Sequence, residues 1–284
     1  VLYREERKRL RSDSVAAPRE MHPEITIVKA DGSREPLDVG RLKTVIGEAC
    51  EGLSDVDGEV VLNETLKNLY DGVTQDDVNT ALIMSARTLV EKEPNYSYVT
   101  ARLLLDDIRA KGLSRLGVAE KATKFEMERL YPDALKAFLT LAVESELVSS
   151  DLLEYNLEKM GAALIAERDN QFTYLGLQTL YDRYFIHKDD VRIELPQVFF
   201  MRIAMGLALK EANREERAIE FYQLLSSFDY MASTPTLFNS GTLRSQLSSC
   251  YLTTVPDNLD GIYSAIRDNA MLSKWAGGLG NDWT

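Results

Sequence analysis

The sequence contains little cysteine, little histidine and no long apolar run. Its two cysteines, Cys50 and Cys250, lie far apart in a chain of 284 residues, which excludes a disulfide scaffold and a CxxC zinc site. The two histidines, His22 and His187, show no carboxylate/His pairing of the diiron kind, so no metal site is predicted. No apolar stretch approaches the ~18 residues of a membrane span. We therefore expect a cytoplasmic protein in a reducing compartment, with no membrane contact.

Basic residues are also in the minority. The chain has 33 Lys and Arg against 45 Asp and Glu, a formal net charge of −12, which argues against a broad surface for a DNA or RNA backbone. A hydrophobic fraction of 45% supports a sizeable core and argues against a disordered protein. The length predicts about two domains.

Both ends of the chain favour the interpretation that it is a fragment of a longer protein. It begins at Val1, without Met, in a charged helical pattern, and it stops at Thr284, soon after a glycine-bearing stretch. We expect a helix over residues 1–12 and a linker over residues 13–23. The first helix is similar to the stretch 98 positions later. This similarity is either chance or a sign that 1–12 is the last helix of a preceding copy of the next module, and we favour the second reading.

Residues 24–112 are predicted to form a compact module that opens with a β-hairpin. Apolar residues alternate with polar ones at Ile25 and Ile27. The dipeptide Asp31-Gly32 is typical of a two-residue hairpin turn because glycine tolerates positive φ. The return strand is expected over about 34–37.

About four helices complete this module. Asp38 can cap a helix whose apolar residues recur at helical spacing. Thr74 and Asp77 resemble a capping box at the start of another helix, which ends at Pro94. The last helix is predicted over about 96–111.

The pattern from residue 115 to residue 232 is mostly helical. One helix is predicted to start at Pro132, a short one to cover 161–167, and a very apolar, buried one to cover 195–209. We expect a loop at 233–236. These helices form a second, helical domain.

The predicted secondary structure changes after this domain. Residues 246–255 are strand-like, residues 259–275 are helical, and the glycines at 277–280 indicate a loop. A strand, a helix and a glycine loop after a set of helices indicate the start of an α/β domain. The predicted fold class is therefore α+β in the first module, followed by a helical domain and an α/β domain.

Cys250 is the residue whose chemistry matters most. On its spacing alone, a lone cysteine on a strand is a buried, small hydrophobic residue more often than a redox thiol, because a redox thiol needs a partner. The other cysteine, Cys50, is expected in the core of the first module. Spacing alone therefore favours the structural reading.

Three ordered motifs change that reading. They are Ser233-Thr234-Pro235-Thr236-Leu237-Phe238-Asn239-Ser240-Gly241-Thr242, Ser248-Ser249-Cys250-Tyr251-Leu252 and Asp257-Asn258-Leu259-Asp260-Gly261-Ile262. Together they closely resemble the large, catalytic subunit of class I ribonucleotide reductases, and the module at 24–112 resembles the ATP-cone at the N-terminus of that family. The resemblance implies that 115–232 is the helical N-terminal domain and that 233–284 is the truncated start of a ten-stranded α/β barrel.

The resemblance implies reduction of ribonucleoside diphosphates at C2′ by thiyl-radical chemistry, for the synthesis of DNA precursors. Cys250 takes the position of the first cysteine of the family's redox pair, which helps to remove the 2′-hydroxyl as water and ends in a disulfide. Substrate contacts are implied for Thr236, Ser249, Ala276 and Gly277. Because glycine has no side chain, a ligand can approach the backbone closely at Gly277.

A specificity site for a deoxynucleotide effector is implied at Asp257, Asn258 and Leu259, near a dimer interface. The alternative for Asp257 is that it caps the helix that follows.

The resemblance also implies partners. No cofactor is expected to be bound by this chain, and the radical comes from a separate, metal-containing small (beta) subunit. A thioredoxin- or glutaredoxin-type protein re-reduces the cysteines, and the large subunit forms a homodimer or larger assembly. The remaining catalytic residues are expected beyond Thr284, so this piece alone is predicted to be inactive.

The implied nucleotide site of the cone contains Lys29, Glu35 and Arg41, the last at a position where a lysine commonly reaches the phosphates of ATP or dATP. Other positions depart from the family pattern: Ala30, Asn79, Asp106 and Ala110. The loss of two cations and the gain of an anion should weaken the binding of a triphosphate. Our hypothesis is that this cone is degenerate and structural.

Two other readings compete with a reductase. ATP-cones also occur in nucleotide-sensing transcriptional repressors, but that reading predicts a zinc ribbon with four cysteines, and the sequence has two. A helical interaction protein predicts no ordered set of the three motifs.

Overall fold

The computed structural model describes residues 25–29, 32–274 and 277–283. The helix predicted at 1–12 and the linker predicted at 13–23 lie outside the described residues, as does Ala276. None of the described helices is long and apolar enough to cross a membrane. In chain order the elements are β1 (Thr26–Val28), β2 (Arg34–Pro36), α2 (Val39–Cys50), α3 (Gly58–Lys67), β3 (Val73–Thr74), α4 (Gln75–Thr88), α5 (Tyr96–Arg115), α6 (Met127–Glu144), η1 (Ser150–Glu154), α7 (Leu157–Ala162), η2 (Ala166–Gln171), α8 (Tyr174–Arg183), β4 (His187–Lys188), β5 (Val191–Arg192), α9 (Pro196–Ala208), α10 (Arg214–Ser226), α11 (Thr234–Asn239), β6 (Cys250–Val255), α12 (Leu259–Lys274) and β7 (Gly278–Trp283).

The first module contains the predicted hairpin and the helices α2 to α5. Strand β1 pairs with β2 in antiparallel fashion and with β3 in parallel fashion, in the order β2-β1-β3. The sequence analysis missed β3, which has only two residues. The predicted two-residue turn is also wrong. The backbone N–H of Lys29 donates to the carbonyl of Ser33, so the hairpin loop is closed by this pair and is longer than two residues. Gly32 has φ +81°, and Asp31 lies outside the described residues.

Two predicted helix starts are confirmed by their caps. The Oδ1 atom of Asp38 accepts a hydrogen bond from the backbone N–H of Arg41 at 2.8 Å. Thr74 and Asp77 form the reciprocal capping box at the start of α4. Each cap satisfies backbone donors that have no partner within the helix.

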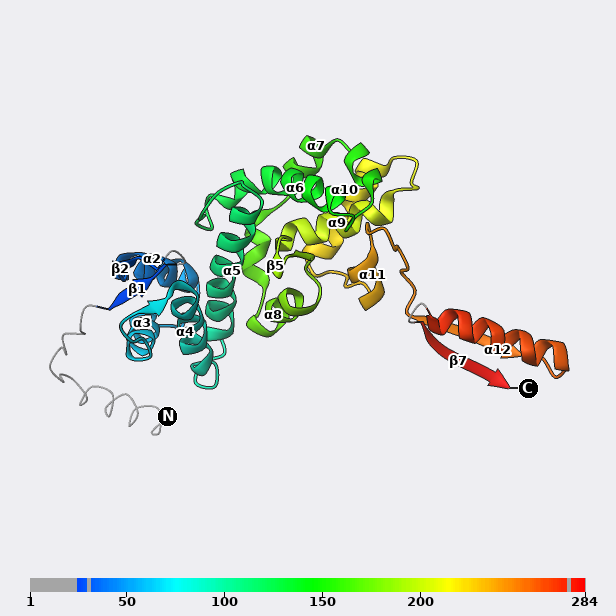
Figure 1. The fold of residues 1–284 in the computed structure, drawn as a ribbon, viewed down its shortest axis with the longest axis horizontal. Coiled ribbons are helices and arrows are strands. Elements are labelled where there is room, and N and C mark those ends of the chain that lie inside the picture. Colours follow the sequence, from blue (N-terminus) through cyan, green and yellow to red (C-terminus); the bar gives the residue numbers. More distant parts are fainter. Residues whose placement is uncertain (1–24, 30–31, 275–276, 284) are drawn as a thin grey trace.

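Helix α5 is shared by the module and the helical domain, and Figure 1 shows it between them. Val99 and Leu103 are buried in the core of the module, whereas Leu105 and Ile108 are buried in the core of the helical domain. This helix is 20 residues long. It therefore links the two cores as one continuous element.

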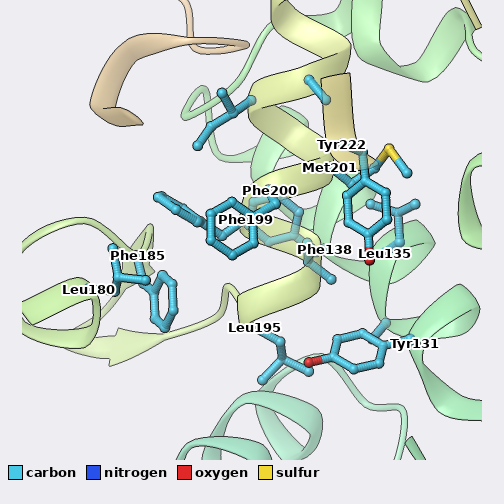
Figure 2. Close-up of a cluster of buried hydrophobic side chains, with 14 of the residues drawn as sticks. Tyr131, Leu135, Phe138, Leu180, Phe185, Leu195, Phe199, Phe200, Met201 and Tyr222 are labelled. Atoms are coloured by element: carbon cyan, nitrogen blue, oxygen red, sulfur yellow. The ribbon is translucent and has the colours of Figure 1, made fainter. Parts of the chain in front are cut away.

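The helical domain is built around the buried helix α9, whose predicted extent and first-turn proline are confirmed. Figure 2 shows the aromatic side chains of Phe185, Phe199 and Phe200 gathered in its core. We refer to α6 through α11 with their connections as the helical body. The domain boundaries predicted from the sequence stay predictions.

Two predictions within the body are wrong. Pro132 lies inside α6 and does not start it. Pro132 packs against Gly161 of α7, where an added Cβ would approach Pro132 to 2.9 Å. The helix predicted at 161–167 is replaced by the end of α7 and the 3-10 helix η2.

The last described elements form a separate strand–helix–strand unit, which comprises β6, α12 and β7. It stands apart from the body in Figure 1. The two strands are parallel, with Cys250 opposite Gly278, and α12 forms the crossover. The start of an α/β domain is thus confirmed. The loop predicted at the glycines is wrong, because Gly278–Trp283 forms β7, and the loop predicted at 233–236 is wrong, because it begins α11.

Candidate functional site

The segment that precedes Cys250, beginning with α11, is anchored by a buried ion pair. Arg202 of α9 and Glu194 both have fully buried side chains, and Arg202 Nε donates to Glu194 Oε1 at 2.6 Å. The other nitrogens of the guanidinium donate to the carbonyls of Ser240 and Leu237. These bonds fasten α11 to the centre of the body.

Close backbone contact strengthens the same anchor. The Ser240 hydroxyl donates to the carbonyl of Ile203 at 2.7 Å. A Cβ added at Gly206 would approach the backbone nitrogen of Gly241 to 2.2 Å. Only glycine at position 206 allows this contact between α9 and the end of α11.

Helix α11 in turn holds the segment before Cys250. The Thr236 hydroxyl donates to the carbonyl of Leu247 at 3.2 Å. The side-chain amide of Asn239 donates to the carbonyl of Gln246 at 2.7 Å. The predicted substrate residue Thr236 is therefore hydrogen-bonded to Leu247, which lies three residues before the predicted redox cysteine at the start of β6.

The candidate catalytic site lies where β6 and β7 begin. Cys250 is exposed, as is Ser249, whose carbonyl accepts a hydrogen bond from Gly278 at 3.0 Å. A Cβ added at Gly277 would approach the ring of Tyr251 to 2.6 Å. The pairing of the strands thus brings Ser249, Cys250 and Gly277 together, and the thiol of Cys250 is exposed.

The predicted effector residues lie at the other end of β6. Asp257 and Leu259 are exposed, and Asn258 Oδ1 accepts a hydrogen bond from the backbone N–H of Gly261 at 2.8 Å. Capping of α12 is therefore made by Asn258 and not by Asp257. Cys250 is the first of the six residues of β6, so this group lies beyond the opposite end of that strand, which rises ~3.3 Å per residue.

The residues implied for the cone nucleotide lie together beside a pocket. Glu35 and Arg41 line a cavity of about 180 Å³ between β2, α2, α4 and α5. Lys29 forms an ion pair with Glu35. Arg41 Nη2 donates to Asp106 Oδ1 at 2.7 Å. Burial raises the pKa of Asp106, and the nearby guanidinium of Arg41 opposes that rise.

A second polar network links the cone to the body, and the sequence analysis missed it. The buried carboxylate of Asp169 accepts hydrogen bonds from Arg109 of α5, Tyr131 of α6 and Gln197 of α9. Burial and the Asp169 charge raise the pKa of Tyr131 well above its ordinary value. No local motif marks these residues, because they come from four separate elements.

Within the described ranges, no group of three or more His, Cys, Asp or Glu side chains is placed to hold a metal ion. The other cysteine, Cys50, is half-buried in α2, and burial raises the pKa of its thiol.

Three family models match successive parts of the chain. They are the ATP cone domain at residues 25–111, the all-alpha domain of ribonucleotide reductase at residues 170–245, and the barrel domain of ribonucleotide reductase at residues 248–284.

Curated proteins are similar over most or all of the chain. The ribonucleoside-diphosphate reductase subunit alpha of Chlamydia muridarum is 43% identical over 290 residues, which cover 100% of this chain and 27% of that protein. The subunit alpha of Helicobacter pylori is 36% identical, over 92% of this chain and 32% of its own length. The large subunit of Danio rerio is 30% identical, over 89% and 31%. The chain spans about a quarter to a third of the length of these relatives.

Proposed function

Since this chain belongs to the ribonucleotide reductase large-subunit family, we propose that it forms part of a catalytic subunit that reduces ribonucleoside diphosphates to deoxyribonucleoside diphosphates. The observation that carries the proposal is the exposed thiol of Cys250 at the start of β6, opposite a glycine of β7. A ligand can approach the backbone closely at such a place.

The proposed role of Cys250 is to supply reducing equivalents together with a second thiol from another part of the enzyme. Oxidation of the two thiols to a disulfide releases two electrons and two protons. At C2′ of the ribose, the C–O bond breaks, the hydroxyl leaves as water, and a C–H bond takes its place. Cys50 lies in α2 of the cone, so the second thiol is not expected from the described residues.

The remaining site residues are proposed to hold nucleotides. Thr236, Ser249 and Gly277 offer hydroxyl and backbone groups for the substrate, and Ala276 adjoins them in sequence. A deoxynucleotide effector is proposed at Asp257, Asn258 and Leu259, which are exposed on the far end of β6.

The partners are also part of the proposal. A metal-containing small subunit would supply the radical, and a thioredoxin- or glutaredoxin-type protein would reduce the disulfide after each turnover. Such dithiol chemistry fits the cytoplasm, and a homodimer or larger assembly is expected. The match to the barrel domain favours a catalytic subunit over a nucleotide-sensing regulator, which would need no barrel.

The test is substitution of Cys250 in the intact enzyme. Cys250→Ser should lower the reduction of cytidine diphosphate with a dithiol reductant by at least about 1,000-fold, as expected when a group that forms a covalent intermediate is lost. Cys50→Ser is the matched control and should retain activity. A Cys250→Ser enzyme with normal turnover would contradict the proposal.

Thiol reactivity gives an independent check on the 284-residue chain. Cys250 should react with a disulfide reagent faster than Cys50, because Cys50 is half-buried and its pKa is raised. Equal rates for the two thiols would contradict the expected difference in accessibility between Cys250 and Cys50.

A further inference from the structure

The cone pocket has room for a nucleotide but contains few free charges. Its lining includes three carboxylates and two cations: Glu35, Asp38, Asp106, Arg41 and Lys121. The cavity of about 180 Å³ adjoins a shallower depression of about 470 Å³, and both are lined by Glu35 and Lys121. Ligand sites commonly have ~300–1,000 Å³; the cavity alone is smaller, but the cavity and the depression together are large enough that size does not exclude a nucleotide. Whether a nucleotide binds in this pocket therefore depends on the charges that line it.

Two of the three cations at this pocket and its adjoining depression, Arg41 and Lys29, already have carboxylate partners. Arg41 Nη2 lies 2.7 Å from Asp106 Oδ1, and the two side chains are 28% and 27% exposed. Lys29, at the adjoining depression, forms an ion pair with Glu35. Lys121 is exposed, and in the described part of the chain no carboxylate lies within salt-bridge distance of it. An anionic ligand would therefore have to compete with internal carboxylates for the inner cation, Arg41.

Asp106 has no obvious way to leave the pocket when a ligand arrives. It lies on α5, which is packed against the cone on one side and the body on the other. The next residue, Asp107, is fixed by hydrogen bonds from Asn79 and Lys111. A triphosphate bound to Arg41 would thus stand beside the displaced carboxylate of Asp106, and repulsion between like charges is strong where water is partly excluded.

We propose that Asp106 acts as an internal occupant of the anion site in this cone: by holding Arg41 it excludes nucleoside triphosphates, and its removal opens the pocket to them. The inference rests on the assignment of residues 25–111 as an ATP cone. It adds a residue and a mechanism to the hypothesis of a structural cone.

The experiment is calorimetric titration of the 284-residue chain with ATP and with dATP. The unmodified chain should show no saturable binding below about millimolar concentrations, whereas Asp106→Ala should bind at least one of the two nucleotides at least about tenfold more tightly. Adding Arg41→Ala to this variant should abolish the gain. Asp106→Asn, which keeps the shape of the side chain, is the alternative should the alanine variant unfold.

Glu64→Ala provides the control for net charge. Glu64 pairs with Lys67 on the exposed side of α3, so its loss changes the total charge by the same amount without opening the pocket. Micromolar binding by the unmodified chain would overturn the proposal, and so would Asp106 variants that bind no better than Glu64→Ala. Neither result bears on Cys250, whose test measures reductase turnover.

Discussion

The helical body and the strand–helix–strand unit differ in how well they cover their own side chains. The body buries even an ion pair completely, that of Arg202 and Glu194. In the unit, Leu252 is 87% exposed, Leu259 is 72% exposed and Trp283 is 61% exposed, although parallel sheets are normally covered on both faces. Within this 284-residue chain, which spans about a quarter to a third of the length of its relatives, the residues proposed for chemistry lie in the less covered region, and the residues that position them lie in the more covered one.

This difference indicates that the two regions have different roles, structural support in the body and chemistry in the strand–helix–strand unit. The body provides a rigid base, to which α11 is fastened by the guanidinium of Arg202. The segment 246–247 is held to α11 by two side-chain hydrogen bonds. Stability should therefore depend on the body, whereas reactivity should depend on the unit. Substitutions in each region can break or sharpen this comparison.

The largest expected effect comes from Arg202→Met. The substitution leaves the carboxylate of Glu194 buried without its cation, and loss of one partner of a buried pair costs about 3–5 kcal/mol. The free energy of unfolding, measured by urea titration with circular dichroism, should fall by that amount.

The matched control is the double variant Arg202→Met with Glu194→Met. It removes both charges and should recover much of the lost stability, because no unpaired charge remains. A single variant as stable as the unmodified chain would show that the body does not depend on this pair, and the comparison would fail.

A medium effect on global stability is expected at Gly206 of the body, and none at Gly277 of the strand–helix–strand unit. Gly206→Ala places a Cβ 2.2 Å from the backbone nitrogen of Gly241, which should cost about 1–3 kcal/mol in the free energy of unfolding because backbone must move. Gly277→Ala meets the ring of Tyr251 at 2.6 Å, and that ring can rotate away at the edge of the unit.

Hydrogen exchange separates these two substitutions. Gly206→Ala should reduce amide protection throughout α9 and α11, because it disrupts the close backbone contact between Gly206 and Gly241. Gly277→Ala should alter protection only in β6 and β7, with the same midpoint of unfolding as the unmodified chain. Equal global destabilisation by both substitutions would remove the proposed difference between the regions.

Local sequence signals identified the elements whose causes are local. The cap at Asp38, the capping box of Thr74 and Asp77, and the apolar helix after Pro196 were all predicted correctly. Each depends on a few neighbouring residues. The family resemblance then pointed to Cys250, which neither spacing nor composition had favoured.

Errors arose where distant contacts override local preference. Pro132 lies inside α6 and packs against Gly161 of α7, a contact that the local sequence does not indicate. The glycines after α12 pair with β6 and form a strand instead of a loop. The anchor of Glu194 and Arg202 was missed altogether, because the carbonyls that complete it come from residues 35 or more positions away.

The smallest effect concerns the alkaline stability of the body. The hydroxyl of Tyr155 donates to the carbonyl of Met205 at 2.7 Å, and burial raises the pKa of Tyr155 from 10.0 to about 12. The folded chain therefore keeps this proton between pH 10 and pH 12, whereas the unfolded chain releases it. Because the unfolded state then binds fewer protons, the contribution of Tyr155 is fully present below pH 10 and is lost as the pH rises toward 12.

Tyr155→Phe tests this sign directly. At pH 8 the variant should be less stable by about 0.5–1.5 kcal/mol, because the carbonyl of Met205 loses its donor. Above pH 10 the difference in melting temperature between the two chains should narrow, since only the unmodified chain has this group to titrate. Tyr263→Phe, at a 65% exposed position in α12, should be as stable as the unmodified chain at pH 8. Two results would contradict this explanation. One is a difference in melting temperature between Tyr155→Phe and the unmodified chain that stays constant up to pH 12. The other is a loss of stability in Tyr263→Phe at pH 8 as large as that in Tyr155→Phe, because buried polar contacts would then not be what distinguishes the body from the strand–helix–strand unit.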